Sequence, residues 1–251
     1  GRALSIARTP TTIYLAGNFQ SVGPLTGQGV PVNTTDGAPL SLYPKVVGSI
    51  EVVIADGHGG WYVGGSFNRV GETSRRNLAH ILANGRVSSW APDPDLTVWA
   101  LLLDRDTLFV GGEFTGIAGA VRHRAAAFDA RNGRLTRWDP DANEVVRAIV
   151  ADSTRLYLGG GFWSVGGLIR RNLAAVDRVD GQPTAWNPES DAGVYTLAVR
   201  GNEVYAGGLF RHVGGQPRDF LAALDRESGA VLPWDWPIAR IPECDHCDGG
   251  P

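Results

Sequence analysis

A short pattern, in which an aromatic residue is followed by x-Gly-Gly-x-Phe, occurs five times and sets the organisation of this chain. Its copies begin at Tyr14, Tyr62, Phe109, Tyr157 and Tyr205, and the first copy has Ala16 in place of the first glycine. Successive copies start 48, 47, 48 and 48 residues apart. A fixed spacing of this length is typical of propeller blades and other stacked arrays. The sequence therefore predicts a repeated unit rather than one unique core.

Other residues keep the same spacing. They are Trp90, Trp138, Trp186 and Trp234, and Gly37, Gly85, Gly133, Gly181 and Gly229. Within the last copy, alternating apolar segments bounded by turn residues predict four short strands, at 194–199, 204–210, 220–225 and 231–234. The repeated tryptophans are expected to pack between neighbouring sheets, because an aromatic side chain of this size is a principal stabiliser when buried.

Four strands in about 48 residues correspond to one propeller blade. We therefore expect an all-β fold, a five-bladed β-propeller with four antiparallel strands per blade. Its blades would cover about residues 1–48, 49–96, 97–143, 144–191 and 192–241 as one domain, followed by a Cys-containing tail at 242–251. An open solenoid is the alternative, but it would need polar capping units, whereas both end units keep their apolar pattern.

Composition narrows the possible partners. The net charge is −3, and no basic stripe interleaved with aromatic residues is present, so we expect no nucleic-acid partner. The longest apolar run, at 98–103, is far shorter than a bilayer span requires, so the chain is not expected to span a membrane. The chain lacks Met and begins with Gly, which suggests a removed signal peptide or a longer parent chain. All but one of its 23 basic residues are arginine, a hint of a GC-rich bacterial genome.

Units that read Tyr-x-Gly-Gly-x-Phe, then Asn-Leu-Ala-x-x-Asp, then Gly and Trp-x-Pro resemble the bacterial delta-type β-propeller repeats, a family of unknown function. They also resemble, more weakly, the propeller repeats of fungal cortical landmark proteins. The resemblance covers Ala3 to Pro237 and implies an extracellular or cell-surface location, but no reaction. The family's Asn is present at Asn77 and Asn172 but is replaced by Arg124 and Phe220, so this position is not expected to be a strict functional requirement.

Catalytic motifs are absent from the sequence. There is no nucleophile elbow, zinc-protease helix or phosphate loop, and the five histidines occupy different positions of the unit, so we expect no catalytic residue, metal or cofactor. Acidic loops such as 93–95, 139–143 and 189–191 could bind a hard cation, but turn formation is the commoner role of Asp and Asn. Glu51 is the one carboxylate expected on a first strand, and a lone carboxylate is weak evidence for glycoside hydrolysis.

Comparison of the five copies singles out two further tryptophans. Trp163 has the polar counterparts Gln20, Asn68, Thr115 and Arg211, so we expect it to be exposed and to border a partner or ligand, although it could instead cover a loop. Trp99 lies on a first strand, which lines the channel of a propeller, and its counterparts by sequence spacing are Leu4, Val52, Arg147 and Tyr195. Both tryptophans are candidate binding residues.

Four arginines form a second periodic set in the loop between the second and third strands. They are Arg75, Arg122, Arg170 and Arg218. One hypothesis is a belt of salt bridges between blades, with Asp95, Asp141 and Asp191 as partners. The other is a basic rim that binds acidic groups.

Cys244 and Cys247 are the only cysteines, and they lie in the non-repeating tail. With His246 they supply at most three of the four ligands that zinc usually takes. We expect a small-loop disulfide if the compartment is oxidising.

These observations favour a non-enzymatic extracellular or cell-surface module that binds a protein partner or belongs to a larger assembly. One alternative is a lectin-like module, which predicts aromatic-lined pockets repeated in each blade. A second is a carbohydrate-active enzyme, which predicts one deep cleft with a perturbed carboxylate.

Overall fold

The computed structural model describes residues 2–17, 19, 28–40 and 43–233, and this part of the chain forms strands and no helix. Each repeat contributes one principal antiparallel sheet, so that five sheets follow one another along the described chain. The strands of these sheets are β1 (Ala3–Arg8), β2 (Thr12–Gly17) and β3 (Gly29–Asn33); β4 (Val46–Ala55), β5 (Trp61–Val70), β6 (Thr73–Ser74) and β7 (Leu78–Ile81); β8 (Val98–Asp104), β9 (Thr107–Gly112) and β12 (Ala125–Asp129); β13 (Val146–Ala151), β14 (Arg155–Gly160) and β17 (Leu173–Asp177); and β18 (Val194–Arg200), β19 (Glu203–Gly208) and β22 (Leu221–Asp225).

Short two-stranded hairpins extend the last three units. They are β10 (Gly116–Ile117) with β11 (Ala120–Val121), β15 (Ser164–Val165) with β16 (Leu168–Ile169), and β20 (His212–Val213) with β21 (Gln216–Pro217). In the second unit the same place is taken by β6, which pairs with the end of the long strand β5.

The fourth segment of each unit differs from the prediction. Instead of a strand it forms one isolated bridge to the third strand, at Val32–Pro39, Ile81–Val87, Phe128–Leu135, Val176–Pro183 and Leu224–Val231. Proline lacks the amide that a ladder needs, which limits pairing at Pro39 and Pro183. The structure thus has three regular strands in most units, followed by a loosely paired fourth segment.

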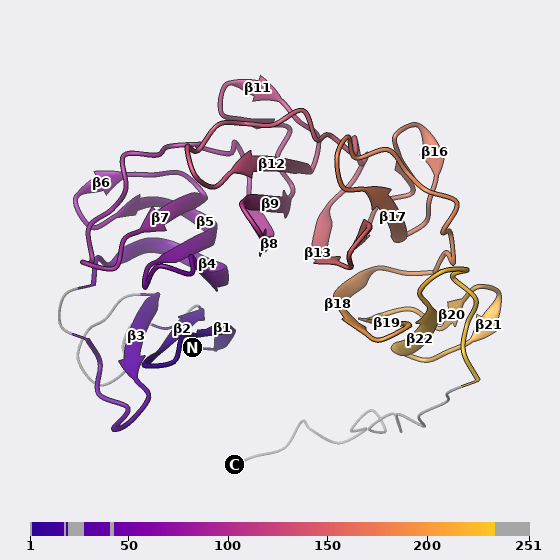
Figure 1. Ribbon diagram of the computed structural model, residues 1–251, viewed down its shortest axis with the longest axis horizontal. Coiled ribbons are helices and arrows are strands. Elements are labelled where there is room, and N and C mark those ends of the chain that lie inside the picture. Colours follow the sequence, from indigo (N-terminus) through magenta and orange to yellow (C-terminus); the bar gives the residue numbers. More distant parts are fainter. Residues whose placement is uncertain (1, 18, 20–27, 41–42, 234–251) are drawn as a thin grey trace, which may run out of the picture.

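The five sheets are arranged in an arc around a common axis (Figure 1). The first strands β1, β4, β8, β13 and β18 lie on the inner side, and each contacts the first strand of the next unit. The described residues form an open arc in place of the predicted closed ring, with the first and last sheets at its two ends.

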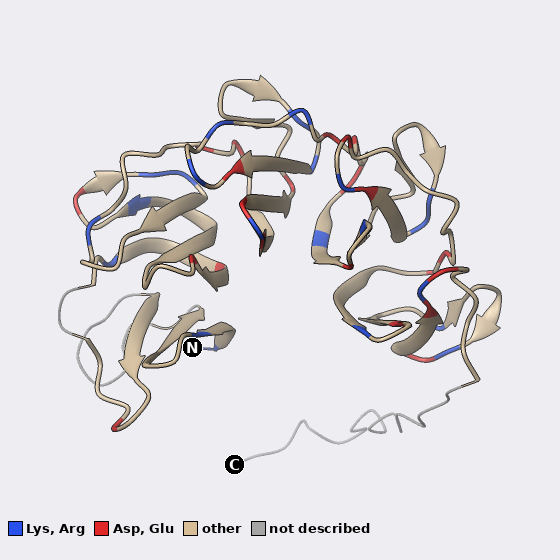
Figure 2. Cartoon of the chain, in the orientation of Figure 1, with Lys and Arg blue, Asp and Glu red and all other residues tan. Residues whose placement is uncertain are grey.

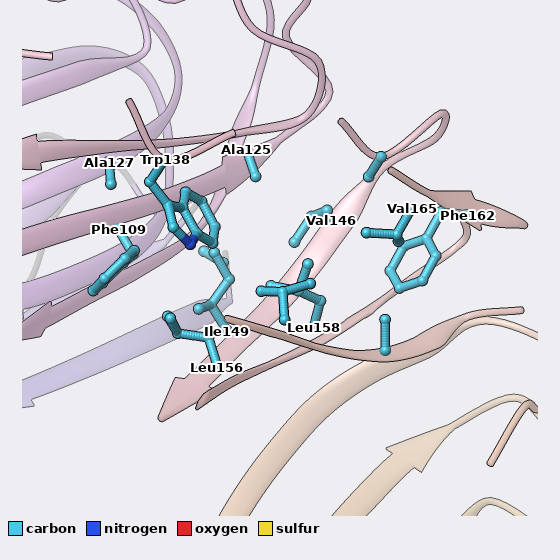
Figure 3. Close-up of a cluster of buried hydrophobic side chains, with 14 residues drawn as sticks. Phe109, Ala125, Ala127, Trp138, Val146, Ile149, Leu156, Leu158, Phe162 and Val165 are labelled. Atoms are coloured by element: carbon cyan, nitrogen blue, oxygen red, sulfur yellow. The ribbon is translucent and has the colours of Figure 1, made fainter. Parts of the chain in front are cut away.

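The hydrophobic core lies between neighbouring sheets, with one cluster of buried side chains at each of the four junctions. Figure 3 shows the junction of the third and fourth units, where Phe109 and Trp138 face Val146, Ile149 and Leu158. A single unit cannot bury these faces alone, so the units stabilise one another.

The repeated glycines permit this close packing. A Cβ added to Gly64, Gly111 or Gly159 would lie only 2.6, 2.8 or 2.7 Å from a valine methyl group on the first strand of the next unit. These glycines therefore permit the close approach of neighbouring sheets.

Candidate functional site

The hairpin β15–β16 of the fourth unit carries the most distinctive surface. Its strands pair Ser164 with Ile169 and Val165 with Leu168, which leaves Gly166 and Gly167 as a two-residue turn. Both glycines have positive φ, 55° and 74°, as a tight turn that matches the twist of a hairpin requires. The turn therefore holds the flanking side chains in a fixed register.

Three large apolar side chains of this hairpin are exposed: Trp163 by 62%, Leu168 by 49% and Ile169 by 58%. We call them the hairpin patch. Their counterparts are Thr115, Ala120 and Val121 in the third unit, and Arg211, Gln216 and Pro217 in the fifth. No other described unit carries three large apolar residues at these positions, so the fold itself does not require them.

A pocket of about 510 Å³ lies beside the hairpin patch. Trp163 and Ile169 form its apolar side, and Arg171, Asn172 and Asp191 contribute polar groups. An apolar wall with a few polar groups is the usual composition of a binding pocket.

Asp191 is fixed by hydrogen bonds to the following hairpin. Its carboxylate accepts the amides of Arg211 (2.8 Å) and His212 (3.1 Å) and lies 2.9 Å from Nδ1 of His212. Partial burial alone would raise the pKa of Asp191, but these hydrogen bonds outweigh it and lower the pKa to about 2. Asp191 therefore contributes a negative charge to the pocket at neutral pH.

The corresponding pocket of the third unit is polar. It measures about 360 Å³ and is lined by residues that include Thr115, His123 and Asp141, with 2.7 Å between the last two side chains. The lectin-like alternative predicts aromatic-lined pockets repeated in each unit, and this pair of pockets does not follow that pattern.

The repeated tryptophans are far less exposed than Trp163. Trp138 is 1% exposed and Trp186 2%, while Trp90 is half-buried. Each of the three donates its indole N–H to a backbone carbonyl of the next unit, Gly133, Asp177 or Asp225, at 2.9, 3.0 and 3.1 Å. The expected difference in exposure is confirmed for these three, whereas Trp234 lies outside the described residues.

The periodic arginines bind within their own units. Each donates from one terminal nitrogen to the carbonyl of the residue before it, and from the other to the carbonyl of Ser88, Thr136, Thr184 or Leu232 in the fourth segment. Arg75, Arg122, Arg170 and Arg218 thus hold the loosely paired fourth segments in place.

The predicted belt of salt bridges between units is wrong for these arginines in the described part of the chain. Over the described residues, only Arg122 of the four has a carboxylate within 4 Å, that of Asp139 in its own unit, at 3.6 Å. The connections between units that carry the acidic residues make other contacts. Asp95 accepts hydrogen bonds from the amide and hydroxyl of Thr115, and Asn143 accepts hydrogen bonds from the amides of Trp163 and Ser164. A role of the arginines as a basic rim stays a prediction.

Trp99 lies on the inner strand β8, half-buried, and the guanidinium of Arg147 on β13 stacks on its ring. The counterpart of Trp99 in the second unit is Glu51, not Val52, because Ile50 pairs with Gly65 just as Val98 pairs with Gly112. The hairpin that joins β4 to β5 is one residue longer, which shifts the spacing. Sequence comparison placed Arg147 and Tyr195 correctly in the same row but did not select them as binding residues.

Glu51 accepts a hydrogen bond from the Ser49 hydroxyl at 2.7 Å. Over the described residues, no group of three or more His, Cys, Asp or Glu side chains is placed to hold a metal ion. The part of the chain that the structure describes contains no helix of the length and apolar character needed to cross a membrane. Cys244 and Cys247 lie outside the described residues, so their pairing stays a prediction.

No protein-family model and no curated protein matches this chain. Among solved structures it is similar to one in a nidogen–laminin complex, with 12% identity, a TM-score of 0.56, and coverage of 94% of this chain and 80% of that one. It is also similar to the WD40 β-propeller domain of Doa1, with 11% identity, a TM-score of 0.62, and coverage of 92% of this chain and 67% of that one. A third similar structure is YCF48 bound to a D1 peptide, with 15% identity, a TM-score of 0.56, and coverage of 96% of this chain and 69% of that one. At these identities the likeness shows a propeller-like all-β fold alone.

Proposed function

We propose that this chain is a non-enzymatic binding module that uses the hairpin patch to hold a protein or peptide partner. The module comprises five propeller units over residues 1–241, with residues 242–251 as a tail, and works outside the cell or at the surface of a bacterium. The exposed cluster of Trp163, Leu168 and Ile169 carries this proposal. Large apolar side chains gathered on a surface mark interaction sites, and Trp is enriched among the residues that dominate binding energy.

Two further observations support a peptide-like partner. The pocket beside the patch combines apolar walls with the fixed charge of Asp191 and the exposed Arg171, so it can hold an apolar side chain and orient a polar one. Of the structurally similar proteins, two are described with bound partners, nidogen with laminin and YCF48 with a D1 peptide.

A peptide library displayed on phage and selected on the intact protein tests the proposal. Enriched peptides are expected to lose binding to a Trp163→Thr, Leu168→Gln double variant, which takes residues that the chain itself uses at Thr115 and Gln216. The control is Val121→Gln, which changes an exposed residue of the third unit. Peptides that bind the double variant as tightly as the original protein would contradict the proposal. Binding of oligosaccharides instead, lost in the same variant, would favour the lectin-like alternative.

A further inference from the structure

A row of side chains crosses the inner wall of the arc, one from each first strand. The row reads Leu4, Glu51, Trp99, Arg147 and Tyr195, on β1, β4, β8, β13 and β18. This row is separate from the hairpin patch, because the patch belongs to the β15–β16 hairpin and not to a first strand. Figure 2 shows one basic segment on β13, at the inner side of the arc, and Arg147 is the one Lys or Arg of that strand.

The guanidinium of Arg147 is enclosed by two aromatic rings. Its central carbon lies 4.6 Å from the centroid of the Trp99 ring and 5.1 Å from that of the Tyr195 ring. Because β8 and β18 are the neighbours of β13 on opposite sides, the two rings belong to strands on either side of Arg147. Stacking of this kind restrains a side chain that is otherwise flexible and leaves the N–H edge as its open side.

The N–H groups of Arg147 have no hydrogen-bond acceptor and no carboxylate partner among the described residues, and its nitrogens are not buried. Glu51, the acid of the same row, is separated from Arg147 by Trp99 and accepts a hydrogen bond from Ser49. The periodic arginines, in contrast, direct their terminal nitrogens to backbone carbonyls. Arg147 is thus restrained in position but keeps its donors free.

We infer that Arg147, between Trp99 and Tyr195, binds a carboxylate on the inner wall of the arc. The N–H edge of the guanidinium is without another partner among the described residues, and a planar carboxylate can accept two parallel N–H bonds there. A phosphate fits less well, because it carries more charge than one arginine offsets and Glu51 lies in the same row. The carboxylate belongs either to a small organic acid or to the C-terminus of a peptide.

The direct test follows the Nε–H signal of Arg147 by NMR, assigned by its loss in Arg147→Lys. Succinate is expected to shift this signal saturably, whereas uncharged succinamide does not. Acetyl-alanyl-alanine and its C-terminal amide form the second arm and show whether a peptide C-terminus binds as well as a small acid. Inorganic phosphate is expected to bind more weakly than succinate.

Two variants, one test and one control, complete the experiment, and their folding is checked by circular dichroism. Tyr195→Leu takes the residue that the first unit has at Leu4 and removes one ring from an exposed position. It is expected to weaken succinate binding about tenfold, because Arg147 loses one of the two stacked rings that restrain it. The second variant, Arg218→Lys, alters a periodic arginine and should leave succinate binding unchanged. An equal response to succinamide, tighter binding of phosphate, or unchanged succinate binding in Tyr195→Leu would overturn the inference.

Discussion

The residue before the third strand has a left-handed backbone in four units. Its φ is 60° at Asn77, 66° at Arg124, 63° at Asn172 and 67° at Phe220. Asn tolerates this conformation, and at Asn77 and Asn172 its side chain also donates to a carbonyl of the next connection, Pro94 or Ser190. The Asn of the repeat therefore serves the backbone, which explains how Arg and Phe can replace it at a cost in stability.

Replacing Phe220 by Asn should stabilise the protein. The left-handed conformation costs a residue such as Phe about 1–2 kcal/mol, and Asn lowers this cost. We expect the free energy of unfolding in urea to rise by about 1 kcal/mol. The reverse change, Asn172→Phe, should lower it by at least as much, and a loss of stability in Phe220→Asn would contradict this reading of the position.

Because of Asp191, the free energy of unfolding should depend on pH in the acidic range. Its pKa is about 2 in the folded protein, against about 3.9 for an unperturbed Asp, so the unfolded chain binds the proton first. The stabilising contribution is complete above about pH 4 and is lost as the pH falls toward 2. Unfolding measured across this window should show a shallower pH dependence in Asp191→Asn, with Asp36→Asn as an exposed control. If the pH dependence of unfolding were as steep in Asp191→Asn as in the original protein, the contribution of Asp191 to acid stability would be refuted.

At the scale of elements, the junction between units depends on the repeated tryptophan. Trp138 fills the space between the third and fourth sheets and donates to the carbonyl of Asp177. Its replacement by Ala should lower the free energy of unfolding by roughly 3–5 kcal/mol. Trp163→Ala should change it by less than about 0.5 kcal/mol, since Trp163 is exposed. Similar losses in both variants would show that the hairpin patch has a structural role.

The first three strands of each unit could be predicted because alternation and the 48-residue spacing are local signals. The fourth strand was wrongly predicted, because its pairing is limited to one bridge, at a proline in two units, and is completed by arginine side chains such as Arg170 that reach across the unit. Comparison of the copies found Trp163, which has no equivalent. It placed Arg147 and Tyr195 at the position of Trp99 but did not select them, because the stacking of an arginine between two rings from different units is a contact that the spacing along the chain does not show directly.

At the scale of the whole molecule, the end of the arc exposes a position that is buried elsewhere. Ile6 on β1 is 65% exposed, whereas its counterparts Val53, Leu101, Ile149 and Leu197 are at most 8% exposed. The arc cannot be inferred from the repeat, because its curvature depends on how side chains set the angle between sheets.

The open arc makes a clear prediction for two of these residues. Ile149→Ala should lower the free energy of unfolding by roughly 2–5 kcal/mol, and Ile6→Ala by less than about 0.5 kcal/mol. Equal losses, measured by urea unfolding, would show that the two ends of the arc meet in solution and that Ile6 packs against the fifth unit.

The repeated residues hold the array together, and we propose that the hairpin patch binds a partner. Hydrogen–deuterium exchange of the intact protein, measured with and without a peptide selected on it, separates these two roles. Added protection is expected on the β15–β16 hairpin and on the connection around Asp191, the segments that line the pocket. Protection on the equivalent β10–β11 hairpin of the third unit, with none on β15–β16, would contradict the proposal.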